Sequence, residues 1–126
     1  MGKGKKFFLN LLKEYYATKR KIIFLSNEIL EYEKKRNNRE EVPEEVLKCE
    51  KQLMEEYKNK IKQYTFINTI IEADFSNEKK ILEDRYLHNK SWQSVAMNNY
   101  ISIRHCFNIE DKVLKGIENE YLKQDN

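Results

Sequence analysis

The stretch that decides the fold is KKFFLNLLKEYYATKRKIIFLSNEILEYEKKR, residues 5–36. Read as four successive heptads, it has eight core positions, a and d, and seven of them are apolar, with Thr18 as the exception. This spacing predicts a helix with a coiled-coil seam. At ~1.5 Å per residue the helix spans about 48 Å, which is too long for a small domain to bury. It therefore needs a partner helix, from the same chain or from a second copy. The a positions are Phe8, Tyr15, Ile22 and Ile29, and the d positions are Leu11, Thr18, Leu25 and Tyr32.

A second long helix follows the one proline of the chain. Pro43 suits the first turn of a helix, and Glu44 and Glu45 suit the positive end of its dipole. We expect this helix over about 44–75. Because the two helices have matching lengths and a short joint, they should form an antiparallel hairpin. Residues 1–75 are thus predicted to be a long helical hairpin for dimerisation or contact with a partner.

The composition supports an all-α fold. The 126 residues include three glycines and one proline, and 36% of them are charged. Such a chain lacks the turn residues of a β-sandwich or β-barrel. The two cysteines, Cys49 and Cys106, form neither a disulfide framework nor a zinc pattern, so no metal or other cofactor is expected. With no apolar run of about 18 residues and no pattern of a signal peptide, a cytoplasmic protein is expected.

The last third of the chain predicts a helix-turn-helix domain over residues 76–126. Serines that suit helix N-caps precede two helical segments, and a tight turn separates these segments. A short helix, a three-residue turn and a second helix make the helix-turn-helix format. The predicted parts are a helix over about 78–88 capped by Ser76 or Asn77, a helix to about 98 capped by Ser91, a turn at 99–101, and a helix to about 122 capped by Ser102.

The side chains of this domain divide into an inward and an outward set. Ala96 is small enough for the point where the two helices cross, and Cys106, ten positions later, supplies a modest apolar group to the core. Arginine reads guanine through two hydrogen bonds, and histidine and asparagine donate to base edges or phosphates. The inward set is completed by Val95, Ile101, Ile109 and Val113, and the outward set is Ile103, Arg104, His105, Phe107 and Asn108.

Three motifs in this region resemble a known family. They are LEDRYL at 82–87, KSWQSVA at 90–96 and SIRHCF at 102–107. Together they resemble the C-terminal half of the ArpU/RinA-type regulators of phages and prophages, which is itself similar to region 4 of sigma factors. Tyr100 stands where the family pattern has a glycine, and Asn99 stands where it has an apolar residue.

The resemblance implies a sequence-specific DNA-binding regulator. Such a protein would activate late phage genes and contact the RNA polymerase of a bacterial host. A homodimer would let two helix-turn-helix domains read two half-sites. The residues that the resemblance places on DNA are Ser102, Arg104, His105 and Asn108, with Lys112 as a flanking phosphate contact.

The charge distribution leaves alternatives open. Residues 79–126 hold eight Lys and Arg against seven Asp and Glu, which is weakly basic for a DNA-binding module. Residues 1–37 hold ten against four, and Lys3, Lys5 and Lys6 could reach phosphates. One alternative is a phage small terminase subunit that binds packaging DNA. Another is a sigma-like interaction module that does not bind DNA. An enzyme is not expected, because the chain has neither a Gly-rich phosphate loop nor His/Cys metal spacing.

Overall fold

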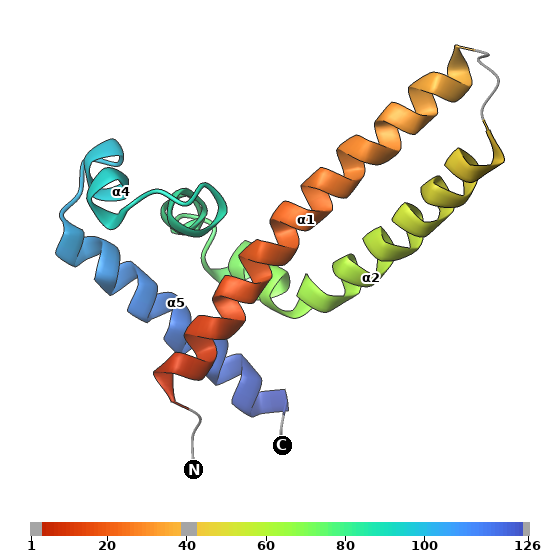
Figure 1. The fold of residues 1–126 in the computed structure, drawn as a ribbon. Coiled ribbons are helices and arrows are strands. Elements are labelled where there is room, and N and C mark those ends of the chain that lie inside the picture. Colours follow the sequence, from red (N-terminus) through yellow and green to blue (C-terminus); the bar gives the residue numbers. More distant parts are fainter. Residues whose placement is uncertain (1–3, 39–42, 125–126) are drawn as a thin grey trace. The chain divides into compact units, whose positions relative to one another are not determined.

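The computed structural model describes residues 4–38 and 43–124. Within them the chain is all-α, with five α-helices and one π-helical turn. The predicted fold is confirmed: a long antiparallel pair is followed by shorter C-terminal helices (Figure 1). Of the predicted joint between the long helices, residues 39–42 lie outside the described part. The elements are α1 (Lys5–Asn37), α2 (Glu44–Asp74), α3 (Lys79–Leu82), the π-helical turn η1 (Glu83–Leu87), α4 (Trp92–Asn98) and α5 (Ile103–Gln124). In this part of the chain no helix is both long and apolar enough to cross a membrane.

By packing, the chain divides into two compact units. One contains the chain up to Ala17 and from Thr65 onward, and the other contains Thr18–Tyr64. We call their described parts the head (residues 4–17 and 65–124) and the arm (residues 18–38 and 43–64). The start of α1 and the end of α2 thus belong to the same unit as α3, α4 and α5. The functional division predicted at residue 75 stays a prediction.

Aromatic rings join the three long helices inside the head. The Tyr121 ring of α5 lies 5.6 Å from the rings of both Phe7 and Phe8 in α1, and 6.5 Å from the Phe66 ring in α2. The Tyr15 hydroxyl donates a hydrogen bond to Asn68 Oδ1 over 3.1 Å. Since three chain segments meet here, the head surrounds the start of α1 on several sides.

The heptad prediction for α1 is confirmed at its a positions, all of which are buried. The structure also buries Leu12 and Tyr16, which lie outside the predicted seam, whereas Leu11 is half-buried. A two-helix seam covers a narrow stripe, but a helix surrounded by several elements buries a wider face. Leu12 and Tyr16 belong to this wider face, and the Tyr16 ring stacks 6.1 Å from the Tyr86 ring of η1.

The arm has a simpler interior. Its buried side chains in α1 are Ile22, Leu25 and Ile29. Ion pairs link its two helices, Arg36 with Glu50 and, over 3.6 Å, Lys21 with Glu56. Several large apolar side chains of the arm remain exposed, namely Ile23, Phe24, Leu30, Leu47 and Met54.

The N-cap predicted for the helix over 78–88 is wrong. Neither Ser76 nor Asn77 caps it, because α3 begins at Lys79 with Glu78 in the cap position and no side-chain cap bond. The Glu78 N–H donates to the Phe75 carbonyl over 3.1 Å. This closes a turn over residues 76–78 and moves the helix start beyond the two predicted caps.

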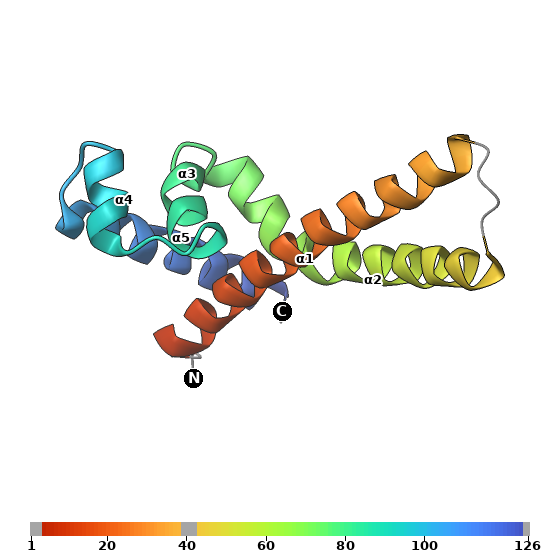
Figure 2. The ribbon, with the colours of Figure 1, turned by 45° about the horizontal axis from the view of Figure 1, so that its top comes forward.

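The second half of the same helix is π-helical rather than α-helical. The His88 N–H donates over 2.9 Å to the Glu83 carbonyl, five residues earlier. Asn89 follows in the left-handed region, with φ 56°, and Figure 2 shows the chain continuing from α3 toward α4. The buried side chains of this turn are Asp84 and Leu87.

Candidate nucleic-acid interface

Two serine caps and one tight turn set the geometry of the helix-turn-helix. Ser91 Oγ accepts from the Ser94 N–H over 3.1 Å, and Ser102 Oγ accepts from the His105 N–H over 3.0 Å. Both predicted caps are thereby confirmed. Between α4 and α5, Tyr100 has φ 57°, the left-handed conformation that a glycine adopts most easily. The turn therefore keeps the left-handed geometry although a tyrosine replaces the glycine.

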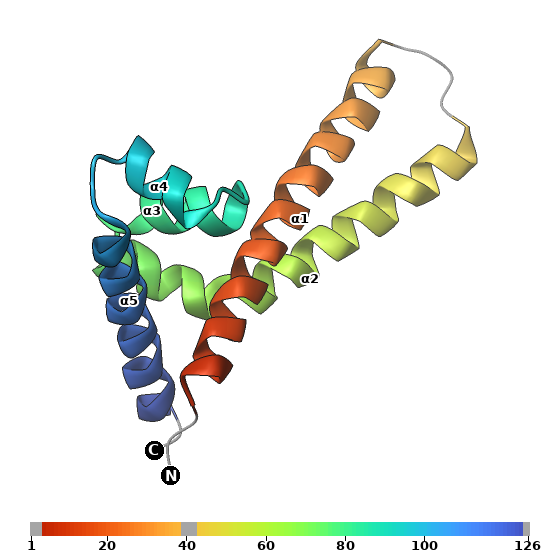
Figure 3. The same ribbon diagram turned by 60° about the vertical axis from the view of Figure 1, so that its left-hand side comes forward.

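The predicted inward set forms the core beneath this turn. Ala96 and Cys106 are buried together with Val95 and with Ile81 of α3, and α4 packs directly on α5 (Figure 3). Trp92, Ile101 and Ile109 pack against this cluster. Burial raises the pKa of the Cys106 thiol, which leaves it protonated at neutral pH. The start of α5 is thus held by apolar packing on its inner side.

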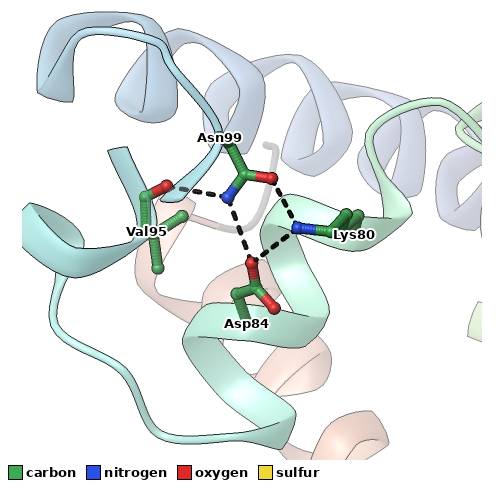
Figure 4. A network of polar contacts seen from close by, with 4 residues as sticks. All are labelled: Lys80, Asp84, Val95 and Asn99. Atoms are coloured by element: carbon green, nitrogen blue, oxygen red, sulfur yellow. Dashed lines mark hydrogen bonds and ion pairs between the residues drawn. The ribbon is translucent and has the colours of Figure 1, made fainter. Parts of the chain in front are cut away.

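A network of polar side chains also stabilises the turn between α4 and α5, in addition to the apolar cluster (Figure 4). The Asn99 amide donates to Asp84 Oδ2 over 3.0 Å and to the Val95 carbonyl over 2.7 Å, while Lys80 Nζ donates to Asn99 Oδ1 over 2.8 Å. Burial acts to raise the pKa of Asp84, but the hydrogen bonds from Asn99 and Lys80 hold this pKa below its ordinary 3.8. Asn99 stands where the ArpU/RinA pattern has an apolar residue, and these partners satisfy its amide.

The polar residues predicted to contact DNA lie on the outer face of α5. Arg104, His105, Asn108 and Lys112 are all exposed. At about 100° per residue, Arg104 and Asn108 lie near the centre of this face, and His105 and Lys112 lie toward one flank. Ser102 is exposed as well, but its hydroxyl serves as the helix cap. The structure thus brings together the four residues on α5, whereas the role of Ser102 on DNA stays a prediction.

Lys112 has an acidic neighbour that its sequence position does not suggest. Its Nζ lies 2.7 Å from Oε1 of Glu78, 34 positions earlier, just before α3. Both residues border a hollow of about 340 Å³ on this flank. Any phosphate that binds Lys112 must compete with Glu78. The hollow is lined by Asn77, Glu78, His105, Asn108, Ile109 and Lys112.

The N-terminal lysines have different positions in the structure. Lys5 Nζ lies 2.6 Å from Oδ1 of Asp111, and this pairing raises the pKa of Lys5. Lys6 is exposed, and Lys3 lies outside the described residues. Because Asp111 belongs to the outer side of α5, the positive charge of Lys5 partly offsets the negative charge beside Arg104 and Asn108.

The other flank of α5 is aromatic and apolar. The Phe107 ring lies 5.5 Å from the Trp92 ring in an edge-to-face arrangement, and the Arg85 guanidinium lies 5.2 Å from the Trp92 ring. The Tyr86 hydroxyl donates to Glu110, and burial raises the pKa of this tyrosine. This flank therefore differs in chemistry from the flank that carries His105 and Lys112.

Comparison with known proteins places the chain in a family. The family described as "Protein of unknown function (DUF722)" matches residues 6–119. The chain belongs to this DUF722 family. No curated protein and no solved structure matches the chain significantly. The DUF722 match covers α1 from its second residue and reaches Asn119 in α5, so the long helices and most of the helix-turn-helix belong to the same family match.

Two features of the candidate interface in this DUF722 chain were missed from the sequence. The network of Asp84 with Asn99 had one signal, because Asn99 stands where the ArpU/RinA pattern has an apolar residue. The pairing of Glu78 with Lys112 had none, since it depends on how closely the start of α3 approaches α5. Both features lie close to the predicted DNA-facing residues, but the prediction of those residues did not depend on them.

Proposed function

We propose that this chain is a sequence-specific DNA-binding transcriptional regulator that reads double-stranded DNA with α5. The observation that carries this proposal is the pair Arg104 and Asn108, exposed one turn apart at the start of a helix that a capped turn holds in place. Within the described part of the chain, neither side chain makes a hydrogen bond or ion pair. Both are therefore available to base edges.

Each polar residue of the outer face has a distinct role in this proposal. Arg104 donates two hydrogen bonds to a guanine, and Asn108 pairs in the same manner with an adenine. His105 and Lys112 contact the phosphate backbone beside the groove, which positions the helix without reading sequence. Ser102 acts through its cap, because the capped helix start also presents backbone N–H groups and a positive dipole to a phosphate.

The biological class of the regulator rests on the resemblance alone. The ArpU/RinA-like motifs favour a phage or prophage activator of late genes, acting in the cytoplasm of a bacterial host and contacting its RNA polymerase. The geometry of α5 is compatible with activation and with repression alike. Contact with polymerase is thus a separate part of the proposal and needs its own binding assay.

The arm supplies the proposed dimer contact. Ile23, Phe24 and Leu30 are exposed on α1 although each is large and apolar, and a second copy of the arm would cover them. Replacing Phe24 and Leu30 by serine should lower the molecular mass measured by sedimentation equilibrium toward that of a monomer. An unchanged mass would show that this surface does not hold copies together.

An interaction module that binds protein rather than DNA is the second candidate. It is favoured by the near-neutral charge of residues 79–126 and by the exposed Met97 and Tyr100 beside the turn. A regulator that reads DNA needs the outer face of α5, whereas such a module would use the turn. Variants of the outer face therefore distinguish the two functions.

The test is a selection on genomic DNA. The full-length protein is mixed with sheared DNA of its source organism at about 150 mM salt, and bound fragments are sequenced. The Arg104→Ala/Asn108→Ala variant is compared with Asn119→Ala/Lys123→Ala, which removes one basic residue and one asparagine from exposed positions four residues apart farther along α5. We expect one locus to be enriched by the wild type and by the second variant but not by the first.

The enriched locus also separates the remaining alternatives. A promoter supports a transcriptional regulator, whereas a packaging-gene locus supports a small terminase subunit. Absence of enrichment with all three proteins would overturn DNA reading. A polymerase pull-down that survives both double substitutions would then support the interaction module.

A further inference from the structure

The start of α5 carries two exposed apolar side chains beside its polar ones. Ile103 is 39% exposed and Phe107 is 46% exposed, and they lie one turn apart on the aromatic flank. Ile103 precedes Arg104 in sequence, and Phe107 precedes Asn108. The apolar pair and the polar pair therefore run side by side along the same two turns of helix. Neither apolar side chain belongs to the core cluster beneath the turn.

The Phe107 ring packs against the Trp92 side chain of α4. The Trp92 ring meets it edge to face at a centroid distance of 5.5 Å and an interplanar angle of 81°. Trp92 is in turn contacted by the Tyr86 ring at 6.1 Å and by the Arg85 guanidinium at 5.2 Å. Phe107 thus presents an apolar surface whose position is set before any partner binds.

The charges around this pair favour DNA as the partner. Asp111 is paired with Lys5, and Glu110 accepts a hydrogen bond from Tyr86, whereas Arg104 has no polar partner within the described residues. Arg104 adjoins this pair on the helix, so a partner that covers Ile103 and Phe107 must also supply acceptors to the guanidinium wherever it buries it. Guanine and phosphate oxygens in a DNA groove satisfy it directly.

We propose that Ile103 and Phe107 read thymine through its C5-methyl group. This inference rests on the proposed function, because it requires α5 to enter the major groove. The groove is about 12 Å wide and admits a helix, and the thymine methyl is the apolar group that base edges present there. The target site then combines thymines on one side of the helix with purines read by Arg104 and Asn108.

The test removes single methyl groups from the DNA. The full-length protein first enriches a site from a pool of random duplexes. The enriched duplex is then synthesised with uracil in place of each thymine in turn, which preserves base pairing and deletes only the C5-methyl group. Fluorescence anisotropy should show about four-fold weaker binding at one or two positions, the factor expected for one buried methyl-sized group.

The variants assign each effect to a side chain. In Phe107→Ala the uracil effect should disappear at one position, and in Ile103→Ala it should disappear at a neighbouring one. Leu122→Ala removes another exposed apolar residue of α5 and should leave both effects intact. Arg104→Ala should weaken binding to all duplexes while the thymine preference remains. Trp92 fluorescence in increasing urea confirms that each variant is folded.

The outcomes separate this inference from the proposed function. If uracil duplexes bind as tightly as thymine duplexes, or if the uracil effect persists in both Phe107→Ala and Ile103→Ala, thymine reading is wrong while DNA binding stands. If no duplex is enriched at all, the proposed function fails and thymine reading fails with it.

Discussion

The head and the arm bury their apolar residues to different extents. In the described chain, 17 of the 20 buried apolar residues lie in the head, and the remaining three, Ile22, Leu25 and Ile29, lie in the arm. Yet the arm, although it is the smaller unit, exposes as many large apolar side chains as the head. Those of the arm are Ile23, Phe24, Leu30, Leu47 and Met54, and those of the head are Met97, Tyr100, Ile103, Phe107 and Leu122. Both units contain parts of the same two long helices.

The difference follows from the number of elements that meet in each unit. In the head, α5 and the segment from α3 to α4 join the ends of α1 and α2, so several faces of each helix are covered. Two helices alone can bury only the seam between them. The head therefore encloses a large core, whereas the arm buries only its seam.

The largest difference between the two units should appear in the free energy of unfolding when a large apolar side chain is truncated. Leu82 is fully buried in the head, and Leu47 is exposed in the arm. Leu82→Ala should lower the free energy of unfolding by about 2–5 kcal/mol, whereas Leu47→Ala should change it by less than about 0.5 kcal/mol. Trp92, the one tryptophan of the chain, reports unfolding of the head by its fluorescence in urea. Equal losses of unfolding free energy in the two variants would contradict the difference in burial between the head and the arm.

Adding volume to the head should also destabilise it. A β-carbon at Gly116 of α5 would overlap the buried ring of Phe75. Overpacking costs about 1–3 kcal/mol, which exceeds the gain of up to about 1 kcal/mol in helix propensity from Gly116→Ala. We expect a net loss of stability in urea unfolding. Phe75→Leu in the same chain should recover part of this loss, and a gain in the single variant would show that the head accommodates the methyl group.

One substitution should stabilise the head. Tyr100 has a left-handed backbone, and its side chain is 95% exposed. Tyr100→Gly relieves a conformation that costs about 1–2 kcal/mol and introduces an entropic cost of about 0.5–1 kcal/mol. The midpoint of urea unfolding should therefore rise modestly. Tyr100→Ala is the matched control, since it removes the ring but keeps the β-carbon, and it should give no such rise.

Ion pairs in the two units should differ in their effect on DNA binding. Glu78→Gln frees Lys112 in the head, so affinity for the selected duplex should rise by up to about five-fold, as expected for an exposed ion pair of up to ~1 kcal/mol. Binding should also depend more steeply on salt. Glu56→Gln in the arm removes the partner of Lys21 and should leave affinity unchanged. A similar rise in both variants would point to net charge alone.

The smallest expected effect is a pH dependence confined to the head. Because the pKa of Asp84 is lowered in the folded chain, its carboxylate stabilises the head above the ordinary pKa. That contribution is lost as the pH falls through the lowered value. Urea unfolding at about pH 6 and about pH 3 should show a smaller acid-induced loss in Asp84→Asn than in the wild type. Identical losses would mean that the network around Asn99 does not depend on this charge.

Much of the fold and of the candidate interface could be predicted from local patterns. The heptad a positions of α1, the Ser91 and Ser102 caps and the burial of Ala96 and Cys106 are all confirmed. The N-cap of α3 was wrong because a turn over residues 76–78 delays the helix start. The π-helical turn was missed because its side-chain pattern does not differ from that of an ordinary helix end.

The sequence by itself determined the helices, their serine caps and the inward and outward faces of the helix-turn-helix. These features depend on residues within one or two turns of each other, so their periodicity is readable. Tertiary structure alone decided which polar side chains meet: Asp84 with Asn99, Glu78 with Lys112 and Lys5 with Asp111. The partners of these pairs are 15 to 106 positions apart, and only the packing of the head brings them within hydrogen-bonding distance.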